Sequence, residues 1–137
     1  MKSSHKTTQL QGWGIAFLRV VAGYLFLVSG AHKLFIDPTS LGELVPVAIG
    51  VALALVELLC GAALVVGLLT RWVSTPLALL MLADILIVHP ADAFFEQDHG
   101  YEYALLRLAA SATLTLTGSG KIALDNILAV RRGKESA

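Results

Sequence analysis

The chain has 137 residues, of which 56% are hydrophobic and 15% charged. Its mean hydropathy of +0.75 excludes an ordinary soluble protein and indicates a single integral membrane domain over residues 1–137. Ten basic and ten acidic residues cancel, which argues against a nucleic acid as a partner. The single cysteine, Cys60, excludes an intrachain disulfide and a thiol-exchange pair.

Four apolar segments are long enough, or nearly so, to cross about 30 Å of hydrocarbon as helices. They cover about residues 12–35, 46–69, 72–89 and 101–117, and the last is the shortest. The breaks between them carry polar or helix-ending residues: DPTSLGEL at 37–44, TRW at 70–72 and HPADAFFEQDHG at 89–100. We therefore predict an all-α, four-transmembrane-helix bundle.

Lysine and arginine are distributed unevenly around the four segments. None lies in the 89–100 connection, and the 37–44 connection has only Lys33 at its edge. The remaining flanks carry Lys2, Lys6, Arg71, Lys121, Arg131, Arg132 and Lys134. Since basic flanks stay in the cytoplasm, we predict that both termini are cytoplasmic and that the acidic 89–100 connection lies outside.

The stretch KIALDNILAVRR, residues 121–132, follows the fourth segment after a GSG turn. Its apolar residues Ala123, Leu124, Ile127 and Leu128 share one helical face, and its end is basic. This pattern is typical of a short interfacial helix that lies on the inner membrane surface.

Four ionisable residues lie well inside the apolar segments: Arg19, Glu57, Asp84 and Arg107. Around the first two, residues recur at alternating spacings of four and three, which keeps them on one helix face. The first face has Arg19, Gly23, Phe26, Gly30 and Lys33, and the second has Gly50, Ala54, Glu57, Gly61 and Leu64. Small residues allow helices to pack closely, so we expect Glu57 to point into the bundle and away from lipid.

These buried charges need partners on neighbouring helices. At a rise of about 1.5 Å per residue, Asp84 and Arg107 lie about 8 Å and about 9 Å from the outer ends of their segments, so we predict a structural ion pair between them. Glu57 lies near the middle of its segment, and Arg19 reaches a similar depth if the first helix begins near Leu10. Such groups either carry function or only fix the helix register.

The same residues give the chain its resemblance to a known family. Four stretches carry it: LRVVAGYLFLVSGAHKLF at 18–35, ELLCGAALVVGLLTR at 57–71, HGYEYALLRL at 99–108 and GSGKIALD at 118–125. In this order they resemble the DoxX family of small four-helix membrane proteins, which is related to the small subunit of thiosulfate:quinone oxidoreductase. The resemblance implies a multi-pass protein of a bacterial or archaeal plasma membrane and electron traffic between a small substrate and quinone.

By this resemblance, eleven residues occupy signature positions of the family: Arg19, Gly30, Lys33, Glu57, Gly61, Gly67, Gly100, Glu102, Gly118, Gly120 and Asp125. The last motif departs from the family pattern at two places. Ser119 stands where the family usually has proline, and Ala123 stands where it usually has serine. A role of that serine is therefore not expected in this chain.

The chain has no obvious electron carrier of its own. It lacks a cysteine pair, a nucleotide motif and a set of iron–sulfur ligands, so we predict no haem, flavin or metal. Electron transfer would then need either a bound quinone, which the resemblance implies, or a cofactor on a partner. His32 and His89 at segment ends are more typical of headgroup contacts than of haem ligands. The residues His89, Asp92, Asp98 and His99 lack the regular spacing of a metal motif.

We therefore predict a DoxX-type, redox-associated membrane subunit of the thiosulfate:quinone oxidoreductase kind that binds a quinone or a similar amphiphile in a polar intramembrane pocket. The candidate pocket residues are Arg19, Lys33, Glu57, Glu102 and Arg107, and Glu57 is the candidate catalytic residue because it can take up or release protons. Two alternatives stay open: a non-catalytic membrane anchor or assembly partner for a soluble oxidoreductase or detoxification enzyme, and a small-molecule carrier. Expected partners are membrane lipid, a soluble redox enzyme or second membrane subunit, and further copies of the chain.

Overall fold

The computed structural model describes residues 2–37, 46–88, 94–95 and 101–135, and within these ranges all regular structure is helical. Long apolar runs without strand alternation leave helices as the structure that satisfies the backbone internally. The elements are α1 (Lys2–Phe35), α2 (Val47–Val66), α3 (Thr70–Ala83), the π-helix η2 (Asp84–Val88), α4 (Glu102–Thr117) and α5 (Leu124–Glu135).

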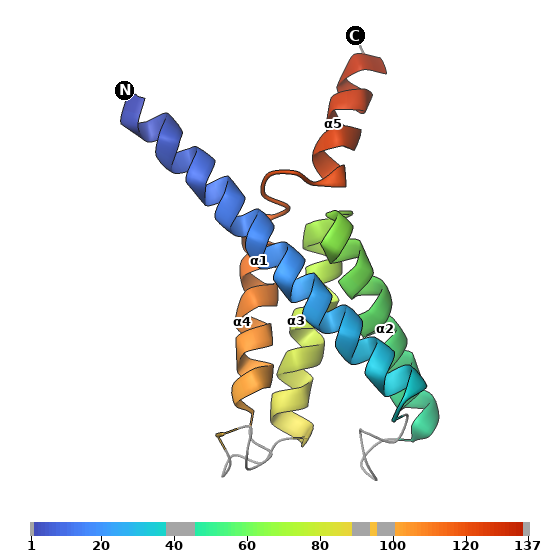
Figure 1. Ribbon diagram of the computed structural model, residues 1–137. Coiled ribbons are helices and arrows are strands. Elements are labelled where there is room, and N and C mark those ends of the chain that lie inside the picture. Colours follow the sequence, from blue (N-terminus) through green and yellow to red (C-terminus); the bar gives the residue numbers. More distant parts are fainter. Residues whose placement is uncertain (1, 38–45, 89–93, 96–100, 136–137) are drawn as a thin grey trace.

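The four helices α1 to α4 run alternately in opposite directions (Figure 1). α1 crosses the bundle diagonally in front of α2, α3 and α4, and both chain ends lie at the same end of the molecule (Figure 1). We call this the terminal end; α2 ends there and α3 begins there. At the opposite, distal end, α1 and η2 end and α2 and α4 begin.

The helices cover the predicted segments with shifted boundaries. α1 begins at Lys2, ten residues before the predicted start, and α5 covers Leu124–Glu135 instead of 121–132. Three helical stretches are long and apolar enough to cross a membrane: Thr8–Phe35, Val47–Val66 and Thr70–Ile87. α4 has 16 residues, about 24 Å at 1.5 Å per residue. The chain is thus an all-α membrane protein with three helices of spanning length in the described ranges.

The buried residues of each helix repeat at spacings of three and four. On α2 they are Gly50, Ala54, Glu57, Gly61 and Leu64, the face predicted from the sequence. The predicted face of α1 is also confirmed, because Arg19, Gly23, Phe26 and Gly30 are buried and Lys33 is half-buried. α3 continues the pattern with Thr70, Ser74, Leu77 and Met81, and α4 with Ala104, Arg107, Ser111 and Leu114. This period keeps one face of each helix toward its neighbours along its length.

Glycines bring α1 and α2 into backbone contact. A Cβ atom at Gly30 would lie 2.5 Å from the backbone nitrogen of Leu58, and one at Gly61 would lie 2.5 Å from that of Leu27. Neither neighbour is a flexible side chain, so the contact cannot relax locally. The two helices therefore depend on small residues at these positions for their close approach.

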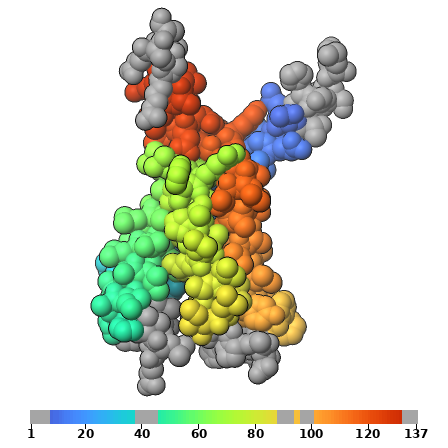
Figure 2. Space-filling view, turned by 180° about the vertical axis from the view of Figure 1, so that it is seen from behind, coloured from blue at the N-terminus to red at the C-terminus, as the bar shows by residue number. Residues whose placement is uncertain are grey.

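α5 stands apart from the bundle. Figure 1 shows α5 and the first turns of α1 diverging at the terminal end, and Figure 2 shows the same divergence from behind. The predicted apolar face of α5 is exposed at Leu124, Ile127 and Leu128, whereas Ala123, just before the helix, is buried. That α5 lies on a membrane surface stays a prediction.

The glycine contact predicts a large difference between two alanine substitutions in α1. Gly30→Ala places its methyl group against the backbone of α2, and overpacking of this kind should lower the free energy of unfolding by about 1–3 kcal/mol. Gly14→Ala is the matched control, since nothing lies within 4 Å of its Cβ position. Unfolding of both variants in mixed micelles, followed by circular dichroism, measures the difference; equal stability would contradict the proposed importance of the α1–α2 contact.

Candidate functional site

An ion pair joins α1 to α2 in the distal half of the bundle. Lys33 Nζ lies 2.7 Å from Glu57 Oε1, the Glu57 side chain is 0% exposed and the Lys33 side chain is 22% exposed. The second carboxylate oxygen, Oε2, is buried and has no hydrogen-bond partner among the described residues. The expectation that Glu57 points into the bundle is confirmed.

The glycine contact decides which cation reaches Glu57. Gly30 faces Ala54 and Leu58, so Lys33, one turn beyond Gly30, comes within reach of the carboxylate. Arg19, which the sequence places at a depth similar to that of Glu57, does not pair with it, because its Nη1 lies beside Gly67 at the end of α2. Ten residues separate Gly67 from Glu57, which is about 15 Å along a helix.

A cavity of about 510 Å³ opens beside this pair, between α2 and the α3–η2 segment; we call it the α2–α3 cavity. Its walls are mostly apolar, and charged groups come from Lys33, Glu57 and Asp84. The full set of lining residues is Lys33, Ile49, Leu53, Val56, Glu57, Pro76, Leu79, Leu80, Ala83, Asp84 and Ile87. An apolar cavity of this size with a few polar groups at one place is typical of a small-molecule site.

The α3 wall of this cavity is irregular at two points that sequence reasoning missed. Pro76 lies inside α3 and removes one backbone donor. Beyond it, Asp84–Val88 form a π-helix, a geometry that is rare and frequent at functional sites. The proline was visible in the sequence, but no sequence pattern identifies a π-helix.

Lys33 also lines a second cavity, of about 320 Å³, between α1 and α4; we call it the α1–α4 cavity. Arg107 and Tyr103 form its α4 wall. On the α1 side it is lined by Tyr24, Leu25, Val28, Ser29, His32 and Lys33. The structure therefore brings Lys33 together with Glu57 on one side and with Arg107 on the other.

The guanidinium of Arg107 is held by a backbone carbonyl and by aromatic rings. Its Nη2 donates hydrogen bonds of 3.0 Å to Leu25 O and 3.0 Å to the Tyr103 hydroxyl. Its Cζ lies 4.3 Å from the centre of the Tyr103 ring and 5.1 Å from that of Phe26. The sequence analysis missed the contact of Tyr103 with Arg107, which lies one turn away on α4. Arg107 lines the α1–α4 cavity and Asp84 lines the α2–α3 cavity. The predicted ion pair between them stays a prediction.

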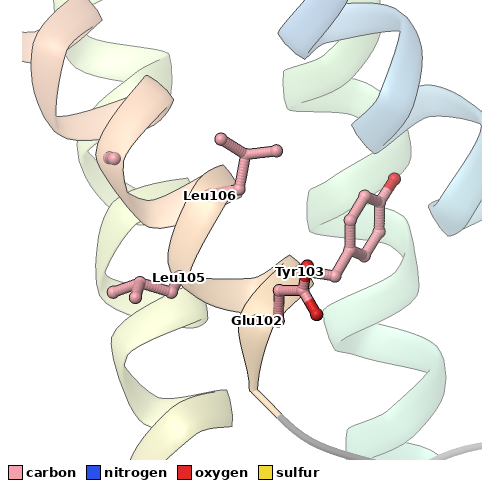
Figure 3. A pocket seen from close by; sticks show the side chains of 5 residues that line it. Glu102, Tyr103, Leu105 and Leu106 are labelled. Carbon is pink, nitrogen blue, oxygen red and sulfur yellow. The ribbon is translucent and has the colours of Figure 1, made fainter. Parts of the chain in front are cut away.

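Glu102 lies at the start of α4 and lines neither of the two cavities that Lys33 lines. With Tyr103, Leu105, Leu106 and Ala109 it lines a hollow of about 590 Å³. Figure 3 shows Glu102 and Tyr103 on one side of the helix and Leu105 on the opposite side. All these lining residues belong to α4, so among the described residues the hollow is a feature of one helix surface.

Arg19 is part of a cluster at the terminal end, which we call the terminal cluster: Arg19, Gly67, Asp125 and the turn 118–123. The Arg19 guanidinium donates to Ser119 O at 2.6 Å and to Ile122 O at 2.8 Å. The Asp125 carboxylate accepts hydrogen bonds from the backbone nitrogens of Leu69 and Thr70, at 2.6 and 3.1 Å, and so caps the start of α3. Arg19 and Asp125 thereby connect the turn after α4 to α1 and to the α2–α3 turn.

The terminal cluster holds strained backbone. Leu69 and Ile122 have positive φ angles of 49° and 52°, a region that residues with a Cβ rarely adopt. The Leu69 nitrogen binds Asp125 and the Ile122 carbonyl binds Arg19, so the same two side chains hold both conformations. Gly67 at φ 76° and Gly120 at φ 66° supply turns without that cost. The motif residues Arg19, Gly67, Gly120 and Asp125 therefore have a structural role at the terminal end.

The residues weighed as a metal or haem site lie largely outside the described residues. This applies to His89, Asp92, Asp98 and His99, and also to Gly100 of the motif at 99–108. His32 is described and lines the α1–α4 cavity. Across the described ranges, no group of three or more His, Cys, Asp or Glu side chains could hold a metal ion.

Comparison with known proteins identifies relatives of the chain. The model of the DoxX family matches residues 14–90, which contain Arg19, Lys33 and Glu57. A Haemophilus influenzae protein described as uncharacterized is 30% identical over 122 residues, which cover 82% of this chain and 88% of the relative. No solved structure matches the chain. The motifs at 99–108 and 118–125 lie beyond the residues that the family model matches.

A pair of variants tests the Lys33–Glu57 bond. Lys33→Met leaves the Glu57 carboxylate buried without its counter-charge and should lower the free energy of unfolding by about 3 kcal/mol. Lys33→Met combined with Glu57→Leu removes both charges and should lose clearly less. Unfolding in mixed micelles measures both. Additive losses in the double variant would show that the two charges do not stabilise each other.

The capping carboxylate of the terminal cluster gives another prediction. Asp125→Ala removes the acceptor for the Leu69 and Thr70 nitrogens and should cost about 0.5–2 kcal/mol of stability. Asp125→Asn keeps one acceptor oxygen and should lose less. Hydrogen exchange of the first turn of α3 should rise in the order native, Asn, Ala. Unchanged exchange in the Ala variant would refute the capping role.

Proposed function

Since the chain belongs to the DoxX family, we propose that this membrane protein is a redox-associated subunit that binds a quinone or a similar amphiphile in the α2–α3 cavity. The single observation that carries the proposal is the buried Lys33–Glu57 pair at the edge of an apolar cavity of about 510 Å³. An amphiphile with a polar head and an apolar body matches both parts of this cavity. The thiosulfate:quinone oxidoreductase relationship makes a quinone the first ligand to test.

In this proposal Glu57 is the catalytic candidate. A buried carboxylate with a free oxygen can exchange the proton that accompanies quinone chemistry. Lys33 holds the carboxylate in place. Arg107 lines the neighbouring α1–α4 cavity, and Lys33 lines both that cavity and the α2–α3 cavity. Arg19 belongs to the terminal cluster and Glu102 lines the hollow on α4, so neither is part of the proposed ligand site.

We propose that α4 also crosses the membrane. It packs against α3 and α1, and its exposed surface includes Leu105, Leu106 and Leu116, which suit contact with lipid. Four crossings put both termini on one side, in accord with their place at one end of the molecule (Figure 1). The basic residues that flank the helices favour a cytoplasmic location of both termini, with α5 on the inner membrane surface. The family relationship favours a bacterial or archaeal plasma membrane as the location of the protein.

A second candidate function is a non-catalytic anchor for a soluble oxidoreductase. The observation that favours it is α5, which projects from the bundle (Figure 2) and exposes Leu124, Ile127, Leu128 and Val130. A soluble partner could cover this face. Co-purification of a stoichiometric soluble enzyme that is lost when residues 124–135 are deleted would support the anchor.

Filling the α2–α3 cavity tests quinone binding. Ala83 lines the cavity, so Ala83→Trp should displace an amphiphile from it. Ala62 is exposed on α2 and is absent from the cavity wall, so Ala62→Trp is the matched control. Native mass spectrometry from lipid nanodiscs should show quinone retained by the native chain and the control and lost from Ala83→Trp. Equal retention by both variants, or none by the native chain, would refute the proposed site.

A further inference from the structure

The α1–α4 cavity differs from the α2–α3 cavity in its charges. Its lining includes Lys33 and Arg107 but no carboxylate among the described residues. The Lys33 ammonium is neutralised by Glu57, so Arg107 leaves this cavity with a net positive charge. Of the nearby carboxylates, Asp84 lines the α2–α3 cavity and Glu102 lines the hollow on α4.

One nitrogen of the Arg107 guanidinium remains for a ligand. Nη2 makes two hydrogen bonds, both to neutral oxygens, those of Leu25 and Tyr103. Nε is buried with no partner among the described residues. Arg107 is 8% exposed and lines the cavity, so Nη1 is the nitrogen that can donate to a group held there. A guanidinium held by neutral groups favours a negatively charged oxygen as its next partner.

The α1–α4 cavity also has an apolar side that faces the surroundings of the bundle. Tyr24 and Val28 line it and are 60% and 44% exposed. Both belong to the stretch Thr8–Phe35, which is long and apolar enough to cross a membrane, so they contact lipid. Together with Leu25 they offer a surface for an acyl chain, and the hydroxyls of Tyr24 and Ser29 can donate to a headgroup. A lipid matches both parts of this cavity, whereas a small inorganic anion matches only the charged part.

Both cations lie near the distal ends of their helices. Lys33 lies two residues before the end of α1, about 3 Å, and Arg107 lies five residues after the start of α4, about 8 Å. The hydrocarbon core of a bilayer is about 30 Å thick, whereas the 16 residues of α4 span about 24 Å. A helix shorter than the core thins the bilayer around it. Lipid phosphate groups next to α4 are therefore brought toward the level of these two cations.

We propose that the α1–α4 cavity binds the phosphate group of an anionic phospholipid. The phosphate accepts a hydrogen bond from Arg107 Nη1, and an acyl chain lies along Leu25 and Val28. A headgroup with a net negative charge balances Arg107, whereas a zwitterionic headgroup brings its own cation next to Arg107 and Lys33. This site is separate from the α2–α3 cavity and does not depend on quinone binding there.

Native mass spectrometry tests the site on the full chain released from nanodiscs of equal parts phosphatidylglycerol and phosphatidylcholine with the same acyl chains. Ammonium acetate at about 0.5 M screens the exposed basic residues of α5. The native chain should retain phosphatidylglycerol about fivefold over phosphatidylcholine, the preference that one basic residue near an anionic lipid gives. Arg107→Gln should reduce this preference to less than about twofold. Arg131→Gln, which removes the same charge from an exposed position on α5, should keep it.

A second pair of variants leaves all charges in place. Val28→Trp fills the lipid-facing side of the cavity and should lose the retained phosphatidylglycerol. Val21→Trp is the matched control, because Val21 is exposed on the same helix and is absent from the cavity wall. This pair decides the question by itself if Arg107→Gln does not fold.

Four results would overturn the proposal. The first two are equal retention of the two lipids by the native chain and equal retention of phosphatidylglycerol by Val28→Trp and Val21→Trp. Displacement of phosphatidylglycerol by inorganic phosphate, added to the native chain in detergent micelles, would identify a free oxyanion as the ligand. Loss of phosphatidylglycerol from Ala83→Trp would place the lipid in the α2–α3 cavity. Unchanged retention by Ala83→Trp supports the α1–α4 site, whether or not that variant loses quinone.

Discussion

The backbone contact between α1 and α2 is the constraint on which the rest of this structure depends. Gly23, Gly30 and Gly61 let the two helices approach until backbone atoms of one meet backbone atoms of the other. At that distance the antiparallel register allows little sliding, because each glycine fits against one particular stretch of its neighbour. The register then brings Lys33 to Glu57 and forms one wall of the α2–α3 cavity.

The buried charges are stabilised in three different ways, and the difference separates structural from functional candidates. Arg19 binds two carbonyl oxygens of the turn 118–123, which holds the terminal end together. Arg107 combines a carbonyl and a tyrosine hydroxyl with two aromatic rings. Glu57 has an ammonium on one oxygen and no described partner on the other, beside a cavity. Arg19 Nε and Arg107 Nε are also buried without a partner among the described residues, and Glu57 is the one of the three side chains that lines the α2–α3 cavity.

Irregular backbone occurs at the terminal end and along the α3–η2 segment, and it has a different role at each place. At the terminal end, the strained Leu69 and Ile122 are held by Asp125 and Arg19, so the strain maintains a packed turn. Pro76 lies inside α3, and the π-helix Asp84–Val88 follows α3 toward the distal end; both contribute to the wall of the α2–α3 cavity. Irregular backbone at membrane depth is tolerated where it is buried or faces a cavity, and here it lines one.

The sequence by itself determined the helical fold, the approximate helix boundaries and the inward faces of α1 and α2, including the burial of Glu57. These follow from local information: apolar length sets a membrane helix, and spacings of three and four set its face. The partner of Glu57, the two separate cavities, the π-helix and the separation of Arg19 from the Lys33–Glu57 pair were decided by the tertiary structure. Pairing between helices depends on their axial register and crossing angle, which arise from the fit of Gly30 and Gly61 against the opposite backbone. Spacing along one helix contains no information about how far its neighbour is shifted.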